Sequence, residues 1–285
     1  MDDNKGKNID DAIKGIADCN DVFCWIDIKI IGHLRIINEL SAGGSAGNLK
    51  KWLLEDDKGL IWAKSRSKEN TFEPEAEVCA YRLACLFGVP AEPYSLTHIR
   101  ELADKPLCIS RDYSSGYKVM SLFRYLISCG INGIATSNGI EKFNLVESVL
   151  SDADKQLHRA ILLFDYIVGN TDRHLRNFDV RVDSDGRLKG LVNMYDTGAA
   201  LFSDEPDMFI EQSCKQGDNF MHSKPYINPH YSQLKLLNSV GCSGLLRQVY
   251  KAEIYKTINS CFKGNRAKWL GTYVMQNAER LGLIC

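Results

Sequence analysis

The stretch GNTDRHLRNF at residues 169–178 decides how this sequence folds and what chemistry it can carry. An apolar run at residues 157–168 comes directly before it and predicts a helix. Two short β-like runs at residues 178–182 and 188–192 come after it, joined by the turn sequence DSDG at 183–186. The stretch is therefore predicted to form a loop between a helix and a β-hairpin.

Asp172 and Asn177 give this loop its predicted chemistry. They lie five residues apart, the spacing at which protein-kinase catalytic loops carry an aspartate beside the attacking hydroxyl and an asparagine on a metal ion. After the hairpin, Asp196 begins the tripeptide DTG in the place of the kinase D-F-G, where its carboxylate can meet the same metal ions. The three residues predict phosphoryl transfer from ATP, with Mg²⁺ held by Asn177 and Asp196.

Neither pattern is specific when taken alone. An aspartate and an asparagine five residues apart are common in loops, and DTG is also the signature of aspartic proteases. A protease of that class needs two such lobes in an all-β chain, whereas the second half of this sequence is dominated by helical patterns. The order of elements around the motifs therefore favours the kinase interpretation.

The chain as a whole is predicted to be α+β, with strands first and helices later. In the first part, strands are predicted at residues 22–30, 49–54, 60–64, 91–99 and 105–112. One helix is predicted there at 74–87, and Gly88 ends it. Residues 114–116 form a linker, and helices are predicted at 121–129, 145–149, 157–168 and beyond 229. We predict a two-lobed protein-kinase-like fold, with an N-lobe at residues 1–115 and a C-lobe at 116–285.

Nucleotide contacts are expected from the N-lobe. The glycine-rich stretch SAGGSAGN at residues 41–48 can fold its backbone N–H groups around phosphates, and Gly43, Gly44 and Ser45 are the candidates. It is not a Walker A motif, because no Gly-Lys-Ser/Thr follows. Lys64 ends the strand LIWAK in the manner of the kinase lysine that neutralises the α- and β-phosphates.

Two further features complete the expected nucleotide site. The partner of Lys64 is expected on the helix at 74–87 or just before it, where Glu73, Glu75 and Glu77 are the alternatives. The stretch CISRDY at residues 108–113 is predicted to lead into the hinge between the lobes, which makes Ser110 and Asp112 candidates near the adenine. The hinge residue itself stays open.

The loop at residues 169–178 closely resembles the HipA family of bacterial serine/threonine kinases, whose catalytic loop reads approximately G-N-x-D-x-H-x-x-N-F. Every fixed position of that pattern is present here. The resemblance extends to the apolar stretch LFDYIV at 163–168, to Asp196, and to EVCAYRLACLFGVP at 77–90. The chain is much shorter than full-length HipA, so it is similar to the short, stand-alone CtkA-type members of the family.

The resemblance implies roles for particular residues. Asp172 would be the general base or the group that orients the hydroxyl, and Glu77 would be the favoured partner of Lys64. His174 would lie close to the γ-phosphate or would only brace the loop; both readings stay open. A serine of the glycine-rich stretch would be autophosphorylated and switch the enzyme off, with Ser41 and Ser45 as candidates. A DNA-binding antitoxin partner is not expected for a chain this short.

Composition narrows the partners. The 285 residues contain 35 Lys and Arg against 36 Asp and Glu, a net charge of −1, which offers no electrostatic footprint for nucleic acid or an anionic membrane. None of the ten cysteines forms a C-x-x-C pair, and there is no apolar run of membrane-spanning length. We expect a cytoplasmic protein, and delivery into a host cell also stays open.

The first hypothesis is a serine/threonine protein kinase that uses ATP and Mg²⁺ on a protein substrate. A small-molecule or lipid kinase is the second, because DRHxxN at 172–177 is also the loop pattern of phosphoinositide kinases. The third is a non-catalytic pseudokinase, which has no need for the whole set of Lys64, Asp172, Asn177 and Asp196. Transfer of AMP in place of phosphate is a further alternative. The oligomeric state stays open.

Overall fold

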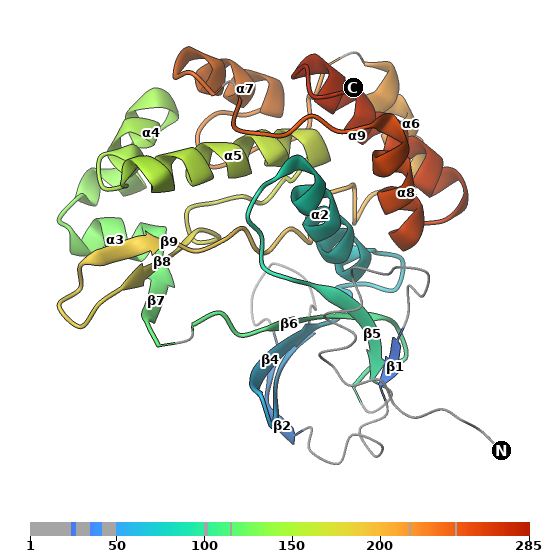
Figure 1. Ribbon diagram of the computed structural model, residues 1–285, viewed down its shortest axis with the longest axis horizontal. Coiled ribbons are helices and arrows are strands. Elements are labelled where there is room, and N and C mark those ends of the chain that lie inside the picture. The colour runs from blue at the N-terminus through green and yellow to red at the C-terminus, as the bar shows by residue number, and fades with distance from the viewer. Residues whose placement is uncertain are drawn as a thin grey trace.

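The computed structural model of the chain describes residues 24–26, 35–41, 50–99, 102–114, 116–216, 218–242 and 244–285. A strand-rich part lies below a larger helical part in Figure 1, and helix α2 (Glu73–Phe87) lies between them. In the described residues, no helix combines the length and the apolar character needed to cross a bilayer.

A six-stranded sheet forms the strand-rich part, in the order β1-β5-β6-β4-β3-β2. All neighbouring strands are antiparallel except β1 and β5, which are parallel. The strands are β1 (Cys24–Ile26), β2 (Arg35–Ser41), β3 (Lys50–Asp56), β4 (Gly59–Lys64), β5 (Ser95–Ile99) and β6 (Leu107–Arg111). The predicted hairpin at 49–64 is confirmed, because β3 and β4 pair directly across the turn at residues 57–58.

The two faces of this sheet have different partners. Ile61 and Ala63 of β4 are fully buried in a small cluster with Leu107 and Ile109 of β6. Side chains alternate between faces along a strand, so Lys64 points to the opposite face. Cys108 of β6, which pairs with Lys64 in the register, is buried in one apolar cluster with α2, so the helix lies on that opposite face. The alternation of β4 therefore directs Lys64 toward α2.

Helix α2 begins with Pro74 in its first turn and ends at Gly88, as the sequence predicts. Gly88 has φ 76°, the left-handed conformation that glycine adopts without strain. The helix also contacts the helical part through α8 (Lys251–Cys261), where Arg82 Nη1 donates to Ser260 Oγ at 2.7 Å. Its buried apolar side chains from Ala76 to Phe87 belong to the large apolar core that also contains α5.

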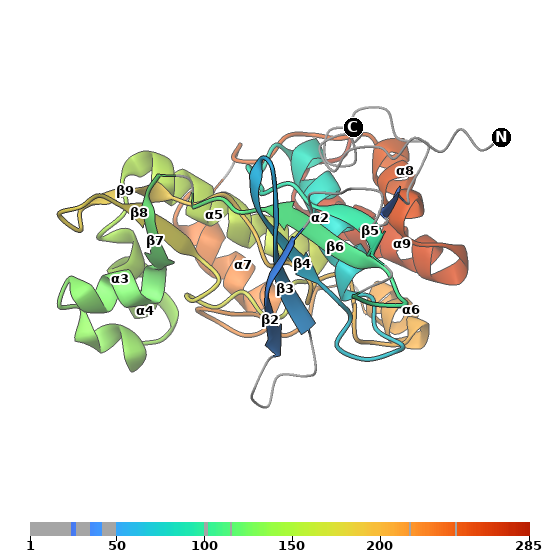
Figure 2. The same cartoon turned by 90° about the horizontal axis from the view of Figure 1, so that it is seen from below.

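The helical part is built around α5 (Asp152–Val168), whose C-terminal half from Ala160 onward is entirely buried. The other elements are α3 (Leu122–Ser128), η2 (Asn132–Ala135), α4 (Gly139–Glu147), α6 (Asp207–Lys215), α7 (His230–Ser239), α8 and α9 (Gly264–Arg280). A three-stranded sheet, in the order β7-β8-β9, lies at one end of this part (Figure 2), with strands β7 (Lys118–Ser121), β8 (Asp179–Val182) and β9 (Leu188–Leu191).

Several boundaries differ from the sequence-based prediction. Strand β7 and helix α6 were not predicted, and α4 ends at Glu147, so the helix expected at 145–149 was wrongly placed. Helix α5 begins five residues before the expected start, because Ser151 caps it by accepting from Asp154 N at 3.2 Å. The first turn of α5 is polar and lacks apolar residues at helical spacing, so the sequence predicted a start too far along the chain.

Candidate active site

The predicted catalytic loop leaves α5 at Gly169, which has φ 64° and ends the helix in a left-handed conformation. A Cβ atom there would lie 2.5 Å from Tyr273 Oη, so this position needs glycine for space as well as for conformation. The loop then closes on itself. Asn170 Oδ1 accepts from Asp172 N at 3.2 Å, and Asn177 Nδ2 donates to the Asp172 carbonyl at 2.9 Å. These bonds fix Asp172 and Asn177 relative to each other.

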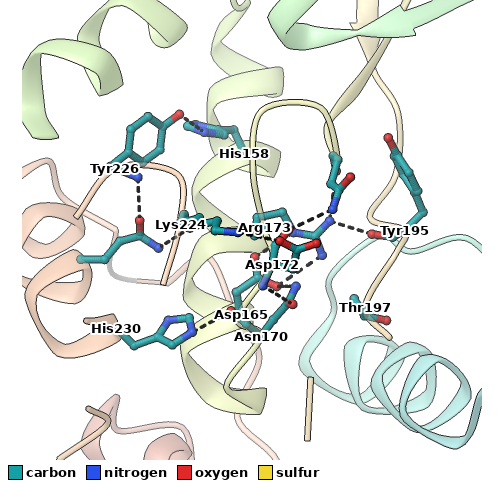
Figure 3. A network of polar contacts seen from close by, with 12 residues as sticks. His158, Asp165, Asn170, Asp172, Arg173, Tyr195, Thr197, Lys224, Tyr226 and His230 are labelled. Carbon is teal, nitrogen blue, oxygen red and sulfur yellow. Dashed lines mark hydrogen bonds and ion pairs between the residues drawn. The ribbon is translucent and has the colours of Figure 1, made fainter. Parts of the chain in front are cut away.

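A buried ion pair between Arg173 and Asp165 connects the catalytic loop to α5 (Figure 3). Arg173 Nε lies 2.9 Å from Asp165 Oδ2 of α5, and both side chains are fully buried. Burial raises the pKa of the Asp165 carboxyl, and the Arg173 charge opposes that rise. Arg173 Nη1 also donates to the carbonyls of Asn177 at 3.0 Å and Tyr195 at 2.6 Å. The pair therefore ties the catalytic loop to the residue before Asp196.

Lys64 brings the N-terminal sheet, α2 and Asp196 together. Its Nζ lies 2.7 Å from Glu77 Oε1 and 2.9 Å from Asp196 Oδ1. Burial lowers the pKa of the Lys64 ammonium, but the charges of Asp196 and Glu77 outweigh it and hold that pKa well above its usual value. Lys64 in turn lowers the pKa of Asp196, against the effect of burial. Lys64 and Asp196 are therefore both charged near neutral pH.

Glu77 makes a second connection across the same site. Its Oε2 accepts from Thr197 N at 2.8 Å and from Thr197 Oγ1 at 3.0 Å, so two hydrogen bonds connect α2 to the DTG segment. Asp196 has φ 55°, an uncommon conformation for a residue that is not glycine. Of the three glutamates left open by the sequence, Glu77 pairs with Lys64, while Glu75 pairs with Arg66 and Glu73 accepts from Ser67.

Asp172 has a partner that the sequence analysis missed. Lys224 Nζ lies 2.7 Å from Asp172 Oδ1, and His174 Nε2 lies 3.9 Å from Asp172 Oδ2. The Asp172 side chain remains 49% exposed, so it can still meet a substrate. Lys224 follows α6 in an irregular segment with no recognisable motif around it. Nothing in the local sequence could have linked it to the loop.

The other predicted nucleotide contacts are placed only in part. Gly43, Gly44 and Ser45 lie outside the described residues, and Ser41 is described only as the last backbone position of β2. Ser110 is buried on β6, opposite Trp62 of β4. Asp112 Oδ1 accepts from Trp62 Nε1 at 3.2 Å. The roles of all these residues toward a nucleotide stay predictions.

Asn177 and Asp196 offer side-chain oxygen atoms, the ligand type that Mg²⁺ prefers. Because Asn177 Nδ2 is used by Asp172, its Oδ1 is the atom left for a cation. Asp196 uses Oδ1 for Lys64. Among the described residues, no three His, Cys, Asp or Glu side chains gather as a metal-binding group. Magnesium bound through one or two protein oxygens together with phosphates and waters matches such a donor set.

Comparison with family models and with curated proteins gives no match to this sequence. Among solved structures, the Helicobacter pylori proinflammatory kinase CtkA matches with a TM-score of 0.65 and 13% identity, over 89% of this chain and 94% of CtkA. This match shows that the chain shares the fold of the CtkA kinase, and it confirms the predicted α+β architecture.

Two further solved structures match less well. The HipA, HipB and operator DNA complex of Shewanella oneidensis MR-1 gives a TM-score of 0.47 at 13% identity, over 86% of this chain and 65% of that chain. A choline/ethanolamine kinase family protein from Mesorhizobium loti gives 0.29 at 13% identity, over 94% of this chain and 83% of that chain. The fold assignment rests on CtkA.

Proposed function

We propose that this chain is an ATP- and Mg²⁺-dependent serine/threonine protein kinase. The observation that carries the proposal is the double ion pair of Lys64 with Glu77 and Asp196. In protein kinases, a strand lysine paired with a helix glutamate and a metal-binding aspartate must be in place together for phosphoryl transfer. The kinase fold of CtkA and the HipA-like loop at residues 169–178 support the same assignment.

Each residue has a role in the proposed reaction. Lys64 neutralises the α- and β-phosphates, and Glu77 holds its ammonium in position. Asp196 and Asn177 would hold Mg²⁺, which when bound offsets the negative charge of the phosphates. Asp172 accepts a hydrogen bond from the acceptor hydroxyl and orients it toward the γ-phosphate. Lys224 positions the Asp172 carboxylate through its contact at 2.7 Å.

The buried pair of Asp165 and Arg173 fixes the positions of the residues around the proposed metal site. Arg173 contacts carbonyls on both sides of the site, at Asn177 and at Tyr195. One side chain, itself fixed by Asp165, therefore holds the backbone of Asn177 and of the residue before Asp196. Catalysis by positioning requires such rigidity, because small displacements of reacting groups are costly in rate.

The test is incubation of the purified full chain with Mg²⁺ and ATP labelled at the γ-phosphate, followed by intact-mass measurement and peptide mapping. The wild type should transfer label to a protein hydroxyl, with Ser41 and Ser45 as the predicted autophosphorylation sites. Asp172→Asn and Asp196→Asn should each reduce transfer by orders of magnitude. Asp183→Asn is the matched control, because Asp183 only caps its own turn and pairs with Lys189.

Three outcomes contradict the proposal. Equal loss from all three variants would identify residues 169–178 as a structural loop. A gain in intact mass that corresponds to AMP, without label from the γ-phosphate, would indicate AMP transfer. Absence of both transfer and nucleotide binding in calorimetry would indicate a pseudokinase that acts as an interaction module.

A further inference from the structure

A cavity of about 310 Å³ opens beside the catalytic loop, on the side of α3, η2 and α4. These three elements lie together at one end of the helical part, away from α8 and α9 (Figure 1). The cavity is lined by Phe123, Ile134, Ala135, Lys142, His174, Leu175, Arg176, Lys224 and Pro225. Its lining does not include Lys64, Glu77 or Asp196, but it shares His174 and Lys224 with the surroundings of Asp172.

The polar side chains of this cavity are all basic. Lys142, His174, Arg176 and Lys224 line it, and no aspartate or glutamate does. Within the described part of the chain, Lys142 and Arg176 have no carboxylate partner, while Lys224 is shared with Asp172. On a chain with a net charge of −1, a concave site with this composition is a local exception. Its charge complements an anion.

The apolar lining makes the basic groups more effective. The Arg176 guanidinium lies 5.3 Å from the centre of the Phe123 ring, which limits the freedom of the side chain. Leu175 is buried, and Pro225 and Ile134 complete the apolar wall. Arg176 itself is exposed, but its contact with the ring means that it has lost part of its rotamer freedom before a ligand arrives.

The cavity is directly connected to the proposed catalytic aspartate. His174 and Lys224 both line it, and both lie within 4 Å of the Asp172 carboxylate, at 3.9 Å and 2.7 Å. Figure 3 shows Lys224 extending toward Asp172 from its own segment. A group bound in the cavity is therefore one or two side chains away from the hydroxyl that Asp172 would orient.

We propose that this cavity binds an acidic side chain of the acceptor protein, close in sequence to the hydroxyl that is phosphorylated. The inference rests on the proposed kinase function and adds a substrate class, acidic serine or threonine peptides. A carboxylate on a short aliphatic stem matches the lining, with the anion at Lys142 and Arg176 and the stem against Phe123 and Pro225. Lys224 keeps its ion pair with Asp172 when the acidic side chain binds.

The experiment uses two fluorescent twelve-residue peptides with one central serine, one flanked by glutamates and the other by glutamines. Transfer from Mg²⁺-ATP is measured for each. The full chain should prefer the glutamate peptide by about tenfold in kcat/KM, through a lower KM. Lys142→Glu combined with Arg176→Glu should abolish that preference. Lys256→Glu, an exposed lysine of α8 at the other end of the helical part, should leave it unchanged.

A second readout does not depend on catalysis. Versions of both peptides with alanine in place of serine are titrated against the protein by fluorescence anisotropy. The glutamate version should bind about tenfold more tightly than the glutamine version, and the double variant should lose this difference while circular dichroism shows an unchanged fold.

The two readouts separate the two proposals. Phosphoryl transfer without a glutamate preference would overturn the acidic-substrate inference and leave the kinase function standing. Selective binding of the glutamate peptide without transfer would overturn the kinase function and leave the acidic-peptide site standing. Free phosphoserine displacing the glutamate peptide at equal concentration would also overturn the inference, because it would identify a site for a small phosphorylated molecule.

Discussion

Lys224 Nζ lies 2.7 Å from Asp172 Oδ1, although the two residues are 52 positions apart in the chain. The contact joins the predicted catalytic loop to a segment that follows α6. It places a positive charge on the carboxylate that would orient the acceptor hydroxyl, and it also reaches the basic cavity. Several expected outcomes depend on this contact and on the ion pairs around it.

Lys224→Met should lower kcat by about a hundredfold and leave the KM for ATP unchanged, because Asp172 loses the partner that fixes its orientation. Steady-state kinetics with varied ATP measures both. Lys224→Arg should recover part of the rate, since it restores the charge. Lys235→Met on α7 removes an exposed lysine in the same part of the chain and is the control. A rise in the KM for ATP with normal kcat would place Lys224 in the nucleotide site instead.

Glu77→Gln should lower kcat/KM for ATP by at least about tenfold, because Lys64 loses a charged partner and Thr197 is bound less strongly. The matched control is Glu73→Gln, one turn earlier on α2, which contacts Ser67 and not Lys64. Equal kinetic effects of both substitutions would mean that the ion pair with Glu77 has no special part in nucleotide use.

Asp165→Asn should destabilise the protein by about 3–5 kcal/mol, because it leaves the Arg173 guanidinium buried without a counter-charge. Urea unfolding followed by circular dichroism measures the free energy of unfolding. Asp152→Asn is the control; its pair with Lys155 is exposed, and its loss should change stability by less than about 0.5 kcal/mol.

The double variant Asp165→Leu with Arg173→Met tests the same pair differently. It should be more stable than Asp165→Asn, since no buried charge is left unpaired. Its activity should still be lost, because Met cannot donate to the carbonyls of Asn177 and Tyr195. Recovery of stability together with activity would show that Arg173 has no positioning role.

His230 should make the protein sensitive to acid. Its imidazole is fully buried, with Nε2 2.8 Å from the Asn170 carbonyl oxygen, and burial lowers its pKa to about 4 from an ordinary value of 6.5. Between pH 6.5 and pH 4 the unfolded chain binds a proton that the folded chain does not. The contribution of neutral His230 to the free energy of unfolding is therefore fully present above pH 6.5. It falls as the pH drops, and about 3 kcal/mol of it is lost at pH 4.

The measurement is the free energy of unfolding of wild type and His230→Gln at a series of pH values from 7 to 4. The variant should lose less stability over this range, by up to about 3 kcal/mol. Identical slopes for the two proteins would show that His230 takes up its proton over the same pH range in the folded and the unfolded chain. Glu147, whose pKa lies at about 2, contributes its own loss only below pH 4.5 and is unchanged in both proteins.

Much of the fold could be predicted because its signals are local. The hairpin of β3 and β4, helix α2 with its glycine end, and the catalytic loop after α5 all follow from alternation, helical period and turn chemistry within a few residues. Helix α6 and strand β7 were missed for the converse reason. The sequence of α6, DMFIEQSCK, is short, and β7 gains its pairing from β8, which lies far along the chain.

The sequence by itself determined which residues carry the proposed chemistry and how Asp172 and Asn177 are spaced, because one loop fixes both. It also placed Lys64 at the end of a strand, leaving three glutamates as its partner. The resemblance favoured Glu77, and the tertiary structure decided that Glu77 is the partner, that Asp196 pairs with the same lysine, and that Lys224 and the pair of Asp165 and Arg173 hold the loop. These contacts arise only when separate elements pack against one shared core, and short-range spacing contains no information about which distant side chains that packing brings together.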